Sequence, residues 1–181
     1  MIAIPFAAGS VLVAIGWILF RIAAYIKTKQ LSWKREAVQL LFLVNLLVIH
    51  RMTFHPFEKL DGQVQPLIFD IATAWPFRIN FIPFVNLLDY DSKRDLLLNL
   101  IGNTAMFIPT GIMTPLIYKN RNGFGKTVLT GFLISLTIEI MQLPFAVRAS
   151  DVDDLILNTL GCAIGYGILT LCRLCKRKPG I

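Results

Sequence analysis

Five stretches of the chain are long and apolar enough to cross a lipid bilayer, and they constrain the fold more than any other feature. A membrane-spanning helix needs about 20 predominantly apolar residues. Because a backbone inside a bilayer must satisfy its own hydrogen bonds, each stretch is expected to be a helix. The sequence therefore predicts an all-α, polytopic membrane helix bundle with about five transmembrane helices. The stretches are Ile2–Ile26, Ala37–His50 (with Phe54 as an alternative end), Leu96–Tyr118, Thr127–Phe145 and Leu155–Leu174.

The composition agrees with this prediction. Of the 181 residues, 55% are hydrophobic and only 16% are charged, and the mean hydropathy is +0.64. A soluble domain of this length carries more charge and less apolar sequence. We therefore expect residues 1–181 to form a single integral membrane domain whose main partner is the lipid bilayer.

The basic residues indicate how the chain crosses the membrane. The 18 Lys and Arg exceed the 11 Asp and Glu, and the excess falls on the connectors after the first and third spans and on the C-terminal tail. Cytoplasmic connectors carry an excess of Lys and Arg. The sequence therefore predicts that the N-terminus lies outside and the C-terminus inside. Since the basic residues occur in short runs between apolar segments, no nucleic-acid partner is expected.

The segment before the third span is apolar but interrupted. Gln65–Phe84 contains three prolines, and the stretches between them are too short to cross a bilayer. We expect an interfacial or re-entrant segment, with a loop packed over the bundle as the alternative. The aromatic side chains suited to the headgroup boundary are Trp75, Phe77, Phe81 and Phe84.

Polar side chains recur at a similar depth in the last three spans. At 1.5 Å per residue, Glu139 and Asn103 each lie roughly 9–10 Å from the outer end of their span. A central acidic residue in a membrane helix costs roughly 2.5–3.5 kcal/mol, so Glu139 is a candidate functional residue. The predicted polar layer consists of Asn99, Asn103, Glu139, Gln142 and Asn158.

This layer has a structural and a functional explanation. Asn and Gln side chains hydrogen-bond across membrane helices at about 0.6 kcal/mol each, and a protonated Glu139 can join them. Alternatively, the layer lines a pocket that is open to the outer surface. The connector above the layer adds further charged groups, which favours the second explanation. The candidate catalytic residues are Glu139, Asp151 and Asp154, and the candidate substrate-binding residues are Asn99, Asn103, Gln142, Arg148 and Asn158.

The last span carries a capping signal and a small-residue motif. Ser150 is expected to cap the helix, with Asp153 three residues later in its first turn. Gly161 and Gly165 form G-x-x-x-G, a pattern that permits close approach of two membrane helices.

The remaining polar residues predict no metal or cofactor. His50 and His55 flank the outer end of the second span, but without a nearby Cys or carboxylate pair they make a poor metal site, and interfacial histidines are the better interpretation. Cys172 and Cys175 form C-x-x-C, yet zinc would need two further ligands, so inert thiols are expected. The sequence also lacks a Gly-rich phosphate loop and a serine nucleophile elbow.

Several of these runs resemble the VanZ-like family of membrane proteins. The resemblance covers about residues 78–167. The matching runs are NFIPF (80–84), NLIGNTAMFIPTG (99–111), EIMQ (139–142), RASDVDD (148–154) and NTLG (158–161). Each of the candidate site residues above falls on one of these runs.

The resemblance implies a protein of the bacterial plasma membrane and cell envelope. The namesake of the family is linked to low-level resistance to the lipoglycopeptide teicoplanin. The first functional hypothesis is therefore resistance or envelope homeostasis, with a lipid-linked envelope molecule or a lipoglycopeptide as the partner. The second is an intramembrane enzyme that acts on a lipid or lipid-linked substrate, with Glu139 as general acid or base. A small transporter or assembly scaffold is a third hypothesis.

Overall fold

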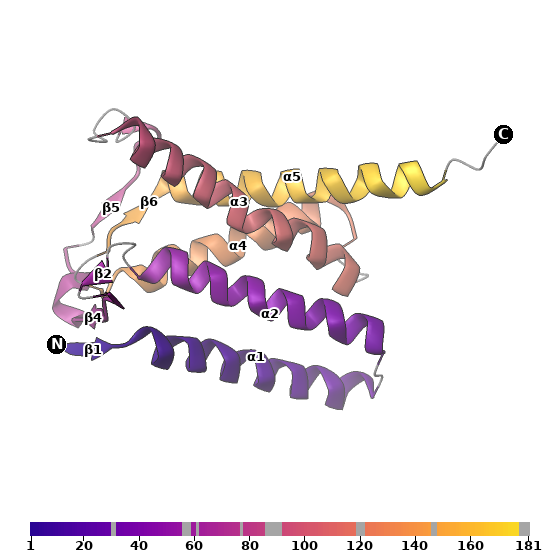
Figure 1. Ribbon diagram of the computed structural model, residues 1–181, viewed down its shortest axis with the longest axis horizontal. Coiled ribbons are helices and arrows are strands. Elements are labelled where there is room, and N and C mark those ends of the chain that lie inside the picture. Colours follow the sequence, from indigo (N-terminus) through magenta and orange to yellow (C-terminus); the bar gives the residue numbers. More distant parts are fainter. Residues whose placement is uncertain are drawn as a thin grey trace. The chain divides into compact units, whose positions relative to one another are not determined.

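Five long helices dominate the computed structural model of the chain (Figure 1). The structure describes residues 1–29, 32–55, 59–60, 62–76, 78–85, 92–118, 122–145 and 148–177. All five helices are long and apolar enough to cross a membrane, so the predicted all-α membrane fold is confirmed. The helices are α1 (Phe6–Thr28), α2 (Trp33–Phe54), α3 (Lys93–Ile117), α4 (Phe124–Gln142) and α5 (Val152–Arg177).

Short strands occupy the ends and connectors of these helices. The first apolar stretch does not begin as a helix, because Ile2–Ile4 form β1 and Pro5 then precedes α1. The residue before a proline is restricted to extended conformations, which explains why the helix starts only after Pro5. The other short elements are β2 (Lys59–Leu60), β3 (Gln63–Val64), β4 (Leu67–Phe69), the 3₁₀ helix η1 (Ile71–Ala74), β5 (Ile79–Asn80) and β6 (Ser150–Asp151).

The segment expected at the membrane interface is built from β4, η1 and β5. Its described residues contain no helix long enough to span a membrane, and its Trp75 side chain is 72% exposed. Phe81 and Phe84 are also exposed, whereas Phe77 lies outside the described residues. An interfacial position for this segment stays a prediction.

The chain divides into two compact units. The first unit contains Met1–Asn80 and Ile138–Ser150, and the second contains Phe81–Thr137 and Asp151–Ile181. The division passes along α4, so the last turn of that helix belongs to the first unit and the rest belongs to the second.

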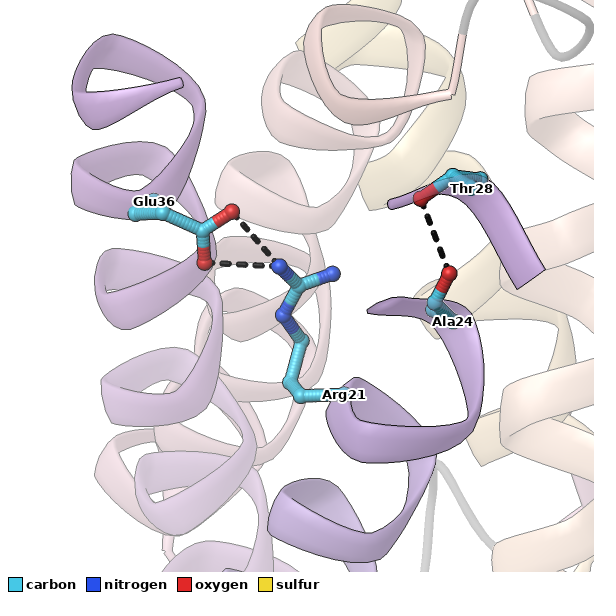
Figure 2. Close-up of polar contacts among 4 residues, drawn as sticks. All are labelled: Arg21, Ala24, Thr28 and Glu36. Atoms are coloured by element: carbon cyan, nitrogen blue, oxygen red, sulfur yellow. Dashed lines mark hydrogen bonds and ion pairs between the residues drawn. The ribbon is translucent and has the colours of Figure 1, made fainter. Parts of the chain in front are cut away.

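In the first unit, α1 lies alongside α2 (Figure 1) and is joined to it at both ends. At one end, Arg21 Nη2 donates to both carboxylate oxygens of Glu36 at 2.6 Å (Figure 2). At the other end, the His50 ring lies against Gly9, where a Cβ would come within 2.6 Å of the ring. Most of the remaining α1 surface is apolar and exposed, as expected for a helix that faces lipid. Figure 2 also shows Thr28, which donates to the Ala24 carbonyl one turn earlier.

Strand β1 lies directly before α1 and belongs to the first unit. It pairs in antiparallel fashion with β4, with Ile2 opposite Phe69 and Ile4 opposite Leu67. The beginning of the chain is therefore tied to the segment that follows α2.

In the second unit, α3 and α5 pack closely along their lengths. A Cβ added at Gly161 would overlap the Thr104 carbonyl oxygen of α3, and one added at Gly165 would overlap the Ile108 carbonyl oxygen. The predicted use of G-x-x-x-G for close helix approach is thus confirmed. Helix α3 continues as one helix through two internal prolines.

Candidate functional site

Glu139 is a buried carboxylate on the last turn of α4. Its side chain is only 4% exposed, and one of its oxygens accepts a hydrogen bond from Ser150 Oγ at 3.1 Å. Ser150 is held in turn by its backbone N–H, which donates to the Arg78 carbonyl at 3.0 Å. A carboxylate taken out of water needs such donors, because unpaired burial of the charged form is costly. Ser150, which the sequence predicts to be a helix cap, is therefore a hydroxyl partner of Glu139 in the structure.

Gln142 and Arg148 bind the end of α2. The carbonyls of residues 53, 54 and 55 accept, in that order, hydrogen bonds from Gln142 Nε2 (2.8 Å), Arg148 Nε (3.1 Å) and Arg51 Nη1 (3.0 Å). The last carbonyls of a helix have no partner within the helix, so these three side chains close its end. The two arginines also place positive charge at the negative end of the helix dipole. We call this arrangement the α2 cap.

The connector after α4 is fastened to the segment between β4 and β5. The Asp70 N–H donates to the Pro144 carbonyl at 2.8 Å, and Arg78 Nη2 donates to the Phe145 carbonyl at 2.8 Å. These bonds hold the residues around Glu139 in position within the first unit.

His50 and His55 lie against other side chains of the first unit. Both residues are buried in the protein, and His55 is 0% exposed, while their position at the membrane interface stays a prediction. Their ring centroids lie 5.1 Å apart. Apolar sequence around them gave no signal for this, because the burial depends on Phe6 of α1, which contacts both rings.

The second unit holds the other predicted site residues. Asn103 on α3 donates to the Asp154 carboxylate on α5. Asn158, which is 1% exposed, donates to Ser135 Oγ on α4 at 2.9 Å. Asn99 is half-buried on α3, one turn before Asn103. These hydrogen bonds link α3 to α5 and α5 to α4 through polar side chains. Such links are expected if the polar residues serve to hold the helices together.

The cap of α5 is Asp151 rather than Ser150. Helix α5 begins at Val152, and Asp151 Oδ1 accepts a hydrogen bond from the Asp153 N–H at 2.9 Å. An N-cap side chain bonds to the second or third N–H of its helix, so the capping prediction was wrong by one residue. The Asp153 carboxylate instead accepts the Phe84 N–H at 2.8 Å. Asp151 therefore has a structural role in addition to its candidate catalytic role.

The predicted polar residues thus fall into two groups. Glu139, Gln142 and Arg148 belong to the first unit. The other five belong to the second unit, so the single layer stays a prediction. The five residues in the second unit are Asn99, Asn103, Asp151, Asp154 and Asn158.

Among the residues that the structure describes, no group of three or more His, Cys, Asp or Glu side chains is arranged to hold a metal ion.

The sequence is similar to known proteins in two comparisons. The family model described as VanZ/LLP1 matches residues 10–173, which reaches from α1 to near the end of α5. Protein VanZ of Enterococcus faecium is 38% identical over 72 residues, which cover 38% of this chain and 44% of the relative. The chain therefore matches less than half the length of that relative. No solved structure matches the chain.

Proposed function

Because the chain belongs to the VanZ/LLP1 family, we propose that it is a bacterial cell-envelope protein that contributes to teicoplanin-type glycopeptide resistance, or to envelope homeostasis, through a polar site inside the membrane. The family and the five apolar helices make it a multi-pass membrane protein. The resistance role rests on the link of the family's namesake to teicoplanin.

The burial of Glu139 carries this proposal. It lies within a helix suited to crossing a membrane, it is almost fully buried, and a hydroxyl from a separate element is aimed at it. An ionisable residue inside the membrane is expensive to keep and usually marks a ligand or proton pathway. Glu139 is therefore the residue on which the proposed site depends.

The chemistry around Glu139 suits a partner with a lipid tail and a polar head. In the proposed orientation the last turn of α4 lies near the outer surface, where the head of a lipid-linked envelope molecule or lipoglycopeptide would lie. A buried carboxylate can accept hydrogen bonds from the amide or hydroxyl groups of such a head.

Glu139→Gln is expected to abolish resistance while the protein still accumulates in the membrane. Glutamine keeps the size of the side chain and still accepts from Ser150, but it carries no charge and does not titrate. The measurement is teicoplanin susceptibility of a deletion strain that expresses each variant, with membrane abundance measured in parallel. We expect Glu139→Gln to match the deletion strain.

Thr137→Ala is the matched control for this experiment. Thr137 lies two residues earlier on α4, is exposed, and donates to the Leu133 carbonyl of its own helix. It should retain full resistance. Full resistance in Glu139→Gln at normal abundance would show that Glu139 only makes structural hydrogen bonds, and it would refute the proposed site.

The enzyme hypothesis shares the same residue and is tested by product analysis. A general acid or base must lie within hydrogen-bond reach of the proton that it transfers, and the bond from Ser150 Oγ shows that Glu139 can accept from a hydroxyl group. If the protein is an intramembrane enzyme, Glu139→Gln should slow its reaction by about 10²-fold or more. Lipid and cell-wall-precursor profiles of cells with and without each variant would then show substrate accumulation. Unchanged profiles alongside lost resistance favour a binding role.

The proposed orientation, with the N-terminus outside and the C-terminus inside, is tested by thiol labelling of intact cells. Ala149 is exposed in the connector before α5, and Cys175 is exposed near the other end of that helix. A membrane-impermeant maleimide should label Ala149→Cys in intact cells, whereas Cys175 should react only after permeabilisation. The reverse pattern would invert the topology.

A further inference from the structure

Three rings join the start of α1 to the end of α2. Phe6 stacks on His50 with a centroid distance of 5.8 Å, and it meets His55 edge-on at 5.4 Å. The two histidine rings contact each other in a T-shaped arrangement with centroids 5.1 Å apart. All three residues belong to the first unit, where this contact helps to hold the beginning of α1.

The hydrogen bonding of the cluster favours uncharged histidines. His55 Nδ1 lies 3.1 Å from the Gln65 carbonyl oxygen, and since a carbonyl only accepts, Nδ1 carries the hydrogen. The Nε2 atom is then a bare acceptor when the ring is neutral. Within the described part of the chain, Nε2 of His55 and Nε2 of His50 are both buried without a hydrogen-bond partner. A proton added to His55 Nε2 would therefore place an N–H and a charge where no acceptor is provided.

Within the described residues, the charges that face His55 are positive. Arg51 comes from α2 and Arg148 from the connector after α4, and the α2 cap fixes both, because each is bonded to a carbonyl at the end of α2. The remaining titratable neighbour in the described cluster is His50, whose protonation would add a further positive charge. Like charges in a partly buried cluster repel one another strongly because little solvent screens them.

These contacts point to a switch that responds to acid. We propose that Phe6, His50 and His55 form an acid-sensitive latch that holds the start of α1 and strand β1 at neutral pH and releases them when His55 takes up a proton. A charged His55 ring would leave the cluster because of the positive charges around it, and its bond to the Gln65 carbonyl would then be lost. Strand β1 pairs with β4, which begins two residues after Gln65, so this movement would loosen both strands of the pairing. In the proposed orientation this end of the protein faces outward, so the signal would be external acid. The latch does not depend on the proposed resistance activity.

The sign of the effect follows from the pKa of His55. It lies below its ordinary value of 6.5 because burial disfavours the charged ring and because Arg51 and Arg148 repel it, although the bond to the Gln65 carbonyl acts in the opposite direction. A lowered pKa means that the released state binds the proton more readily than the latched state. Stability of the latched state is therefore complete above pH 6.5 and is lost as the pH falls through the lowered pKa.

Hydrogen exchange of the β1 amides tests the latch in the purified full-length protein. Exchange of residues 2–4, expressed relative to the rate of an unstructured peptide at the same pH, should be slow at neutral pH. It should accelerate by up to about ten-fold per pH unit in acid, which is the limit for uptake of one proton. Amides near the Arg21–Glu36 pair, at the other ends of the same two helices, should show no such acceleration.

His55→Asn removes proton uptake at this position while it keeps a polar side chain in the cluster. Asparagine can keep a donor near the Gln65 carbonyl but takes up no proton, so its β1 exchange should not depend on pH after the same correction. A wild-type protein without pH dependence, or pH dependence that persists in His55→Asn, would refute the latch.

A second measurement needs no variant. The chain contains only two histidines, so a tag-free protein with labelled histidine gives two sets of imidazole NMR signals. One of them should titrate below pH 6.5, in the same range in which β1 exchange accelerates. If β1 exchange accelerates while neither ring titrates, the release has another cause and the proposal fails.

Discussion

Gly165→Ala is expected to lower the free energy of unfolding by on the order of 1–3 kcal/mol, or more if the helices cannot shift. The new Cβ would overlap the Ile108 carbonyl oxygen and come within 3.1 Å of the Gly111 Cα, so the obstacle is the backbone of α3 and not a movable side chain. Relief requires separation of α3 from α5, which also forfeits the weak Cα–H···O contacts that close packing allows. The measurement is a denaturant titration of the purified protein in detergent.

Gly167→Ala provides the matched control two residues away on α5. Nothing lies within 4 Å of the position that its Cβ would take. Removing a glycine from a helix interior should stabilise the protein by roughly 0.5–1 kcal/mol. The two substitutions are chemically identical, and we expect opposite signs. If Gly165→Ala and Gly167→Ala changed the free energy of unfolding equally, α3 and α5 would not be packed as closely as the structure shows.

Arg148→Met is expected to destabilise the protein by about 1–3 kcal/mol, because it removes a charged donor from a carbonyl at the end of α2. Methionine keeps much of the length and apolar stem of arginine, so the loss reports mainly on the guanidinium. Exchange of the amides in the last turn of α2 should accelerate together with the loss of stability. Both quantities can be measured on the same purified sample.

Arg94→Met is the control for Arg148→Met. Arg94 is an exposed arginine in the first turn of α3, and its replacement should leave stability within about 0.5 kcal/mol. The comparison also decides between two roles for Arg148. If Arg148→Met is fully stable but has lost teicoplanin resistance, Arg148 contacts a ligand and the α2 cap does not need it.

Most of the membrane fold was predictable because hydropathy is a local property. Each predicted span overlaps one observed helix, and α2 runs to Phe54, the longer of its two predicted ends. The error at Ile2–Ile4 has a physical cause. An apolar stretch reads the same in a helix and in a strand, and here the pairing with β4 and the position of Pro5 decide the outcome.

The candidate site was less predictable because its contacts are distant in sequence. Burial of Glu139 could be inferred from the apolar run around it, but the identity of its donor could not, since Ser150 also fitted a capping pattern. The pairing of Arg148 with the end of α2 had no local signal. The one available hint was Arg51, a basic residue in the last turn of α2, which is typical of a helix end that needs donors.

The α2 cap has a consequence for the order in which the protein is made. Gln142 and Arg148 lie 89 and 94 residues beyond the carbonyls that they bind. At a synthesis rate of roughly 5–20 residues per second, they leave the ribosome roughly 5–20 seconds after the end of α2. During that interval two of the three cap bonds cannot exist, whatever the insertion machinery does with the helix. The second span therefore reaches its final structure only when the fourth has been translated, so the first unit is completed late even though it contains the beginning of the chain.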